Sequence, residues 1–160
     1  MNAIIRQKLN RIKDKLTVMP DSILVGSIGE SLSDAQEVAG EIEMYTQYID
    51  FIRDFNGATL GEIEIFPLEE AERNQFYVDH LIGGRTNWRF IGNILYEPLV
   101  INKNDGNVYR IYRDFDEDHP TESFGCFDEF LMNYALGKKY SSIIPFDSED
   151  QWAKLINTID

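Results

Sequence analysis

The order in which helical and strand-like apolar patterns follow one another constrains the fold of this chain more than any other feature. Residues 1–20 carry apolar side chains spaced by three and four positions, the spacing of one face of an α-helix. These side chains are Ile5, Leu9, Ile12 and Leu16. A second helical pattern covers residues 38–56 and ends at Asn56-Gly57, since both residue types tolerate the left-handed conformation that follows a helix. Its apolar face is formed by Val38, Ile42, Tyr45, Ile49, Phe51, Ile52 and Phe55.

The middle of the chain has the two-residue periodicity of β-strands. In Thr59–Phe66, Ile63 and Ile65 alternate with Glu62 and Glu64, which predicts one half-buried strand. The two isoleucines would face the core of the protein. The two glutamates would then face outward, into solvent.

A β-hairpin is predicted farther along the chain. Residues 99–101 and 108–112 are rich in apolar and aromatic side chains, and Asp105-Gly106 between them is a common turn pair. If one of these strands lies at the edge of the sheet, it could pair with a second chain. The sequence therefore leaves the oligomeric state open.

Helical patterns return after the strands. Ser123 is predicted as the N-cap of a helix with an apolar face of Phe127, Phe130, Leu131 and Tyr134, and Ser148 with Gln151 forms a capping box before a last helix. Helices on both sides of a run of strands predict an α+β fold. We expect a single domain spanning residues 1–160, with a central antiparallel sheet of about five to six strands flanked by N-terminal and C-terminal helices.

Charge is distributed unevenly along the chain. The 160 residues include 15 Lys and Arg against 28 Asp and Glu, a formal net charge of −13. Residues 1–20 carry five basic residues and one acidic residue, so this predicted basic amphipathic helix is +4 and the other 140 residues sum to −17. The acidic part argues against binding to nucleic acid and to anionic membranes, and it offers the basic helix an intramolecular partner.

The N-terminal residues and the cysteine content indicate a cytoplasmic compartment. The first 16 residues lack the apolar run of a secretory signal, and no stretch approaches the 18 apolar residues of a membrane span. The single cysteine, Cys126, has no second cysteine with which to form an internal disulfide. We expect Cys126 to be a small buried side chain rather than a nucleophile.

The sequence contains few residues with the spacing that catalysis or metal binding requires. His80 and His119 are the only imidazoles, so a hydrolase would have to use one of them with a carboxylate. Neither has a second histidine at zinc-ligand spacing. The acidic residues 114–118 do not fit an EF-hand, because positions 6 and 12 of that loop would be His119 and Gly125. No catalytic residue, cofactor or metal is predicted.

The acidic residues have a second use, since a dense negative surface steers basic proteins toward a binding site. We expect a partner-binding surface built from the outward side of the predicted strand, the next two glutamates and the acidic loop. Its candidate residues are Glu62, Glu64, Glu69, Glu70, Asp114, Asp116, Glu117 and Asp118.

Three blocks of sequence resemble the SUKH superfamily. Residues 45–57 (YTQYIDFIRDFNG) resemble its aromatic helix ending in Asn-Gly. Residues 88–109 are similar to its central strands, with Gly92 after an apolar strand and the Asp105-Gly106 turn. Residues 122–131 (ESFGCFDEFL) resemble its closing helix. The resemblance covers about residues 38–136.

The resemblance implies an α+β domain that binds a protein and has no enzymatic activity. Many bacterial members of the superfamily are immunity proteins that neutralise toxins, often nucleases, of polymorphic toxin systems. A regulatory scaffold for a cellular protein is the alternative. The resemblance also implies structural roles: packing for Tyr48, Phe51 and Phe55, a helix stop at Gly57, turns at Gly92 and Gly106, an N-cap at Ser123, and core positions for Phe127 and Phe130.

Overall fold

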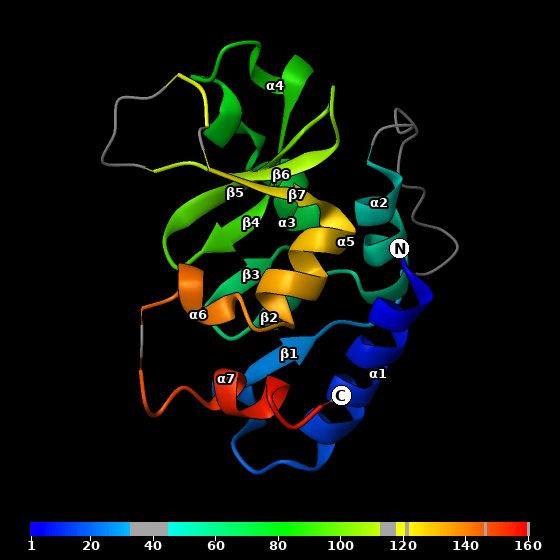
Figure 1. Ribbon diagram of the computed structural model, residues 1–160. Coiled ribbons are helices and arrows are strands. Elements are labelled where there is room, and N and C mark those ends of the chain that lie inside the picture. Colours follow the sequence, from blue (N-terminus) through cyan, green and yellow to red (C-terminus); the bar gives the residue numbers. More distant parts are fainter. Residues whose placement is uncertain (33–44, 113–117, 121, 146, 160) are drawn as a thin grey trace.

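The computed structural model of the chain has an α+β fold, as the sequence predicts (Figure 1). The structure describes residues 1–32, 45–112, 118–120, 122–145 and 147–159. The helices and helical turns are α1 (Ala3–Val18), η1 (Ser22–Leu24), α2 (Thr46–Phe55), α3 (Leu68–Arg73), η2 (Gln75–Val78), α4 (Gly84–Asn87), α5 (Phe127–Glu129), the π-helical η3 (Phe130–Ala135), α6 (Tyr140–Ile143) and α7 (Gln151–Ile156). The strands are β1 (Gly26–Ile28), β2 (Ala58–Leu60), β3 (Ile63–Ile65), β4 (Trp88–Ile94), β5 (Glu97–Asn102), β6 (Asn107–Arg110) and β7 (Glu122–Cys126).

The strands form one antiparallel sheet in the order β1 to β7, so each strand pairs with the next one along the chain. The sheet has seven strands within the described residues rather than five to six. One reason is that Thr59–Phe66 is not a single strand: it folds back at Gly61-Glu62, and Leu60 pairs with Ile63. The predicted hairpin is confirmed as β5 and β6, which lie inside the sheet, whereas β1 and β7 form its edges.

The basic N-terminal helix is confirmed as α1. Its predicted apolar face is buried in full: Ile5, Leu9, Ile12 and Leu16. On the exposed side, the Arg6 Nε lies 2.7 Å from an Asp54 carboxylate oxygen and the Lys13 Nζ lies 2.8 Å from one of Glu30. The acidic part of the chain therefore does partner the basic helix, although exposed pairs of this kind add little stability.

Apolar side chains fill both faces of the sheet. On one face, the rings of Tyr48 and Phe51 in α2 each lie 5.4 Å from Phe127, between centroids, and Phe55 and Phe130 belong to the same cluster. The packing roles of these five aromatic residues are thus confirmed. The opposite face is covered by α3 and η2 over a smaller cluster that consists of Phe66, Ala71, Val78, Leu81, Trp88, Phe90, Val100 and Ile111.

The predicted helix over residues 38–56 begins at Thr46, with Tyr45 as its non-helical N-cap, and residues 33–44 lie outside the described residues. It ends where the sequence predicts. Asn56 has φ 40° and Gly57 has φ 100°, so both residues adopt the left-handed conformation at the helix end. The Asn56 side chain also accepts a hydrogen bond from the Leu68 amide at 2.9 Å, which joins this helix end to the start of α3.

The predicted N-cap at Ser123 is wrong. Ser123 lies in β7, paired with Tyr109 of β6, and the helix starts four residues later. Cys126 is the N-cap: its amide donates to the Glu129 carboxylate at 3.0 Å, and its side chain accepts from the Glu129 backbone. Cys126 is accordingly only partly buried, contrary to the expectation of a buried side chain. The last helix is also capped by another residue than predicted, Asp150 in place of Ser148.

Gly106 occupies the turn of the β5–β6 hairpin with φ 72°, as predicted, but Gly92 is not a turn residue. Gly92 lies within β4, at a bulge opposite Ile65 and Leu99. A Cβ atom at this position would lie 1.9 Å from the Glu64 carbonyl oxygen. Only a residue without a side chain lets β3 and β4 approach this closely.

Gly92→Ala is therefore expected to destabilise the protein by about 1–3 kcal/mol, the usual cost of overpacking a site that has no room. Urea denaturation followed by circular dichroism measures the change. Gly84→Ala shows the effect of backbone strain without overpacking, because the nearest atom to a Cβ there is 3.9 Å away while its φ of 46° costs a residue with a side chain about 1–2 kcal/mol. A Gly92→Ala variant as stable as the wild type would contradict the steric explanation.

Across the described residues, no helix combines the length and the apolar character needed to cross a membrane.

Candidate protein-binding surface

A cleft of about 410 Å³ opens where two hairpin turns meet η1 and the segment between α6 and α7. Four of the side chains that line it are carboxylates: Glu62, Asp147, Glu149 and Asp150. None of the described residues lining the cleft is a lysine or an arginine. Lys154 lies outside the cleft lining and contacts Glu149, with 3.4 Å between Nζ and Oε2. The cleft thus has an excess of negative charge, and we name it the acidic cleft.

A buried hydroxyl joins two walls of the acidic cleft. The Tyr140 hydroxyl accepts a hydrogen bond from the Glu62 amide at 3.0 Å and also hydrogen-bonds to the Asp150 carboxylate. Asp150 in turn accepts from the Ala153 amide at 2.9 Å and so caps α7. Burial, followed by the charges of Asp150 and Glu62, raises the pKa of Tyr140, so the phenol stays protonated and keeps its donor.

The two hairpin turns are also held together by backbone contacts. The Leu95 amide, in the β4–β5 turn, donates to the Glu62 carbonyl at 2.7 Å. Gly61 has φ 64°, and a Cβ there would lie 2.3 Å from the Tyr140 hydroxyl and 2.8 Å from the Trp152 Cβ. Glycine therefore allows the β2–β3 turn to rest directly on α6 and α7. These contacts fix the β2–β3 turn, the β4–β5 turn, α6 and α7 relative to one another, so the shape of the acidic cleft is set by the fold.

The predicted acidic residues do not form one surface. Glu62 lies in the acidic cleft, in the β2–β3 turn. Glu64 does face outward on β3, as predicted, and partial burial and the nearby Glu70 raise the pKa of its carboxyl. Glu69 makes an exposed pair with Arg73 at 3.7 Å on α3.

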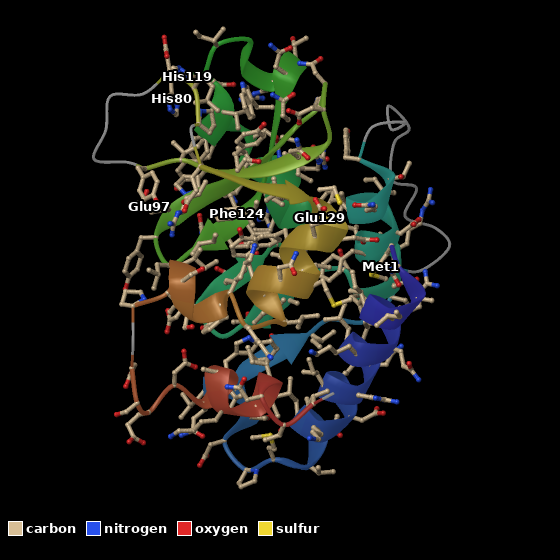
Figure 2. All side chains as sticks on the ribbon, in the orientation of Figure 1. Met1, His80, Glu97, His119, Phe124 and Glu129 are labelled. Atoms are coloured by element: carbon tan, nitrogen blue, oxygen red, sulfur yellow. The ribbon has the colours of Figure 1, made fainter. Side chains whose placement is uncertain are left out.

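The remaining predicted residues belong to the acidic loop. Asp118 pairs with His119, with 2.7 Å between the carboxylate and Nδ1, and this hydrogen bond lowers the pKa of the Asp118 carboxyl. His119 lies at the end of the molecule far from α7 (Figure 2). Asp114, Asp116 and Glu117 lie outside the described residues.

Sequence reasoning missed three of the four carboxylates of the acidic cleft: Asp147, Glu149 and Asp150. The signal for them was the short run Asp147-Ser148-Glu149-Asp150 between Pro145 and Trp152. By its local pattern, that run predicts only the start of a helix. What brings it to Glu62 is the contact of Trp152 with the β2–β3 turn, which connects residues about 90 positions apart and leaves no local pattern.

Among the described residues, neither histidine lines a cavity with a carboxylate and a nucleophile, which is the geometry that the hydrolase alternative requires. His80 and His119 are both exposed, and they line neither the acidic cleft nor a neighbouring cavity of about 270 Å³ beside α6 and α7. The imidazole–carboxylate pair of His119 lies on the surface, and Cys126 is engaged as a helix cap. In the part of the chain that the structure describes, no three His, Cys, Asp or Glu side chains are grouped so as to hold a metal ion.

Comparison with known proteins found no family model, no curated protein and no solved structure that matches this chain.

Proposed function

We propose that this chain is a cytoplasmic, non-enzymatic protein-binding domain that recognises a basic protein through the acidic cleft. The observation that carries the proposal is a preformed cleft whose described lining contains four carboxylates and no lysine or arginine. A lysine or arginine side chain of a partner would find charge-assisted hydrogen bonds there. No cofactor or metal is part of the proposal.

The biological role that we propose is neutralisation of a toxin domain, as an immunity protein of a bacterial polymorphic toxin system. The net charge of −17 outside the N-terminal helix would accelerate association with a basic domain. Nuclease domains are often basic because their substrate is anionic. The resemblance of residues 45–57, 88–109 and 122–131 to the SUKH superfamily supports the same role.

The salt dependence of association tests this function. The partner is first recovered by affinity purification from the cells in which the chain is made, and the purified pair is then studied by stopped flow. Raising NaCl from about 50 to 300 mM should slow association roughly 10-fold and change dissociation much less, because salt screens long-range steering. An association rate that does not change with salt contradicts an acidic contact surface.

Charge reversal locates the contact. Glu62→Lys with Glu149→Lys should slow association roughly 10-fold at low salt. Glu69→Lys with Asp118→Lys is the matched control: it alters net charge equally, and Asp118 and Glu69, like Glu149, each contact one exposed side chain, which is His119, Arg73 and Lys154 respectively. We expect a clearly smaller effect from the control pair. Equal effects would mean that only net charge matters and that the acidic cleft is not the contact site.

The regulatory-scaffold alternative makes a different prediction for the same partner. If the chain is an immunity protein, the partner alone arrests the growth of a host cell, and co-expression of the chain restores growth. If the chain is a scaffold, the partner is not toxic and the complex forms without any protective effect. The growth assay therefore separates the two roles.

A further inference from the structure

Three aliphatic side chains in the segment that leads to the acidic cleft are largely exposed. Val18 is 80%, Ile23 85% and Leu24 81% exposed, and the three lie within the seven residues from the end of α1 to the end of η1. The next residue, Val25, is 5% exposed and belongs to the core. Single exposed aliphatic residues are common, but three in one short segment mark a candidate interaction surface. We name Val18, Ile23 and Leu24 the apolar patch.

The segment that carries the apolar patch is held in an ordered turn. Asp21 has φ 59°, and its carbonyl accepts a hydrogen bond from the Leu24 amide at 2.9 Å. The Val25 amide donates to the Ser22 carbonyl at 2.9 Å, which completes η1. Burial of Val25 fixes η1 to the core while Ile23 and Leu24 remain outside. Their exposure is thus a property of the local structure, and little ordering is needed before a partner binds.

The apolar patch meets the acidic cleft at Leu24, which lines the cleft together with Glu62 and Glu149. On another wall, Leu95 lines the cleft and its neighbour Tyr96 is 83% exposed. Apolar anchors surrounded by charged groups are the usual composition of a protein–protein contact. Charge complementarity identifies the occupant as a basic protein.

Other occupants fit this surface less well. Two copies related by a twofold axis through the patch would bring the carboxylates of both acidic clefts close together, which is unfavourable. An anionic bilayer would repel the same carboxylates. A basic protein with an apolar pocket could bind the acidic cleft through its cationic side chains and the apolar patch through its pocket.

We propose that the apolar patch, above all Ile23 and Leu24, is the anchor that enters an apolar pocket of the basic partner, beside the lysine or arginine that occupies the acidic cleft. This inference rests on the proposed function and assigns different roles in binding to the carboxylates and to the aliphatic side chains. The carboxylates set the rate of association. The aliphatic side chains set the lifetime of the complex, because desolvated anchors contribute most of the binding energy.

The test measures dissociation from the partner recovered by affinity purification. Ile23→Ser with Leu24→Ser should accelerate dissociation roughly 100-fold and change association less than about threefold. The matched control is Ile4→Ser with Ile82→Ser, since these side chains are 63% and 62% exposed and neither lines the acidic cleft. The control should dissociate at the wild-type rate. Melting temperatures near that of the wild type verify that both variants are folded.

Each outcome has a distinct meaning. If the Ile23/Leu24 variant dissociates as slowly as the wild type while the charge reversals still slow association, the proposed function stands and the anchor is refuted. If the wild type binds no basic protein, the proposed function itself fails. Sedimentation of the chain alone, and its binding to phosphatidylglycerol vesicles, complete the test. Self-association or vesicle binding that the same serine variant abolishes would also refute the anchor, by assigning the patch to another occupant.

Discussion

Replacing Trp152 with alanine is expected to lower the free energy of unfolding by about 3–5 kcal/mol, the usual loss when a buried tryptophan is removed from a core. The side chain is 1% exposed and its Nε1 donates to the Ala135 carbonyl at 2.9 Å. It lies against the glycine of the β2–β3 turn and against Gly26 of β1. Urea denaturation followed by circular dichroism measures the loss.

Trp152→Phe is the control for this variant, because it keeps an aromatic ring and removes the indole donor. Its expected cost is about 1–3 kcal/mol, from the unpaired Ala135 carbonyl and the smaller ring. Trp152 also lines the acidic cleft, so Trp152→Ala should disturb Glu149 and Asp150 and weaken partner binding as well. A loss below about 1 kcal/mol for Trp152→Ala would show that α7 is held in place by other contacts.

The sequence predicts best the elements whose pattern is local and uninterrupted. The four apolar residues of α1 are all buried, because a period of 3.6 residues defines one face wherever the helix docks. The stop at Asn56-Gly57 and the β5–β6 hairpin follow from backbone conformations that asparagine and glycine favour. These features depend on neighbours only a few residues away.

The errors occur where a tertiary contact decides the local structure. Ile63 and Ile65 do alternate with glutamates, but the chain turns back at Gly61, so that Leu60 pairs with Ile63. The turn packs against Tyr140 and Trp152, which leave space only for a glycine at position 61. Ser123 precedes a helical pattern, yet pairing with Tyr109 keeps it in a strand, and the helix is capped by Cys126. Cysteine is not a preferred N-cap, so residue type alone pointed to Ser123.

The acidic cleft could not be predicted for the same reason. Its carboxylates come from a hairpin turn and from the segment before α7, and they meet because α6 and α7 dock on the β2–β3 turn. The net charge of the chain predicts that the binding surface is negatively charged. Which of the 28 acidic residues form that surface depends on the fold. Of the predicted residues that the structure describes, only Glu62 lines the cleft.

A buried arginine connects the sheet edge to the wall of the acidic cleft. The Arg110 side chain is 9% exposed, and its Nε lies 2.6 Å from Glu122 Oε2 across the β6–β7 pair. Its Nη1 donates to the Ile143 carbonyl at 3.3 Å, at the end of α6 and next to Ile144 of the cleft. The Tyr112 hydroxyl donates to the same Glu122 oxygen at 2.7 Å. Arg110 thus fixes α6 relative to β7.

Arg110→Met should lower the free energy of unfolding by about 3 kcal/mol, because Glu122 loses its cationic partner and keeps only the Tyr112 hydroxyl, and the buried Ile143 carbonyl loses the Arg110 donor. Urea denaturation measures this loss. Glu122 is 31% exposed, so some water reaches its carboxylate, and the expected loss lies at the lower end of the range for a broken buried pair.

The double variant Arg110→Met with Glu122→Gln separates charge from shape. It removes the negative charge that Arg110→Met leaves without a cation, so it should be about 1–2 kcal/mol more stable than Arg110→Met alone, because breaking a buried pair costs more than replacing both partners. If the double variant is no more stable than the single one, the loss comes from the Ile143 contact and the position of α6. In that case Arg110→Met should also slow association with the basic partner, since the carboxylates of the acidic cleft follow directly after α6 in the chain.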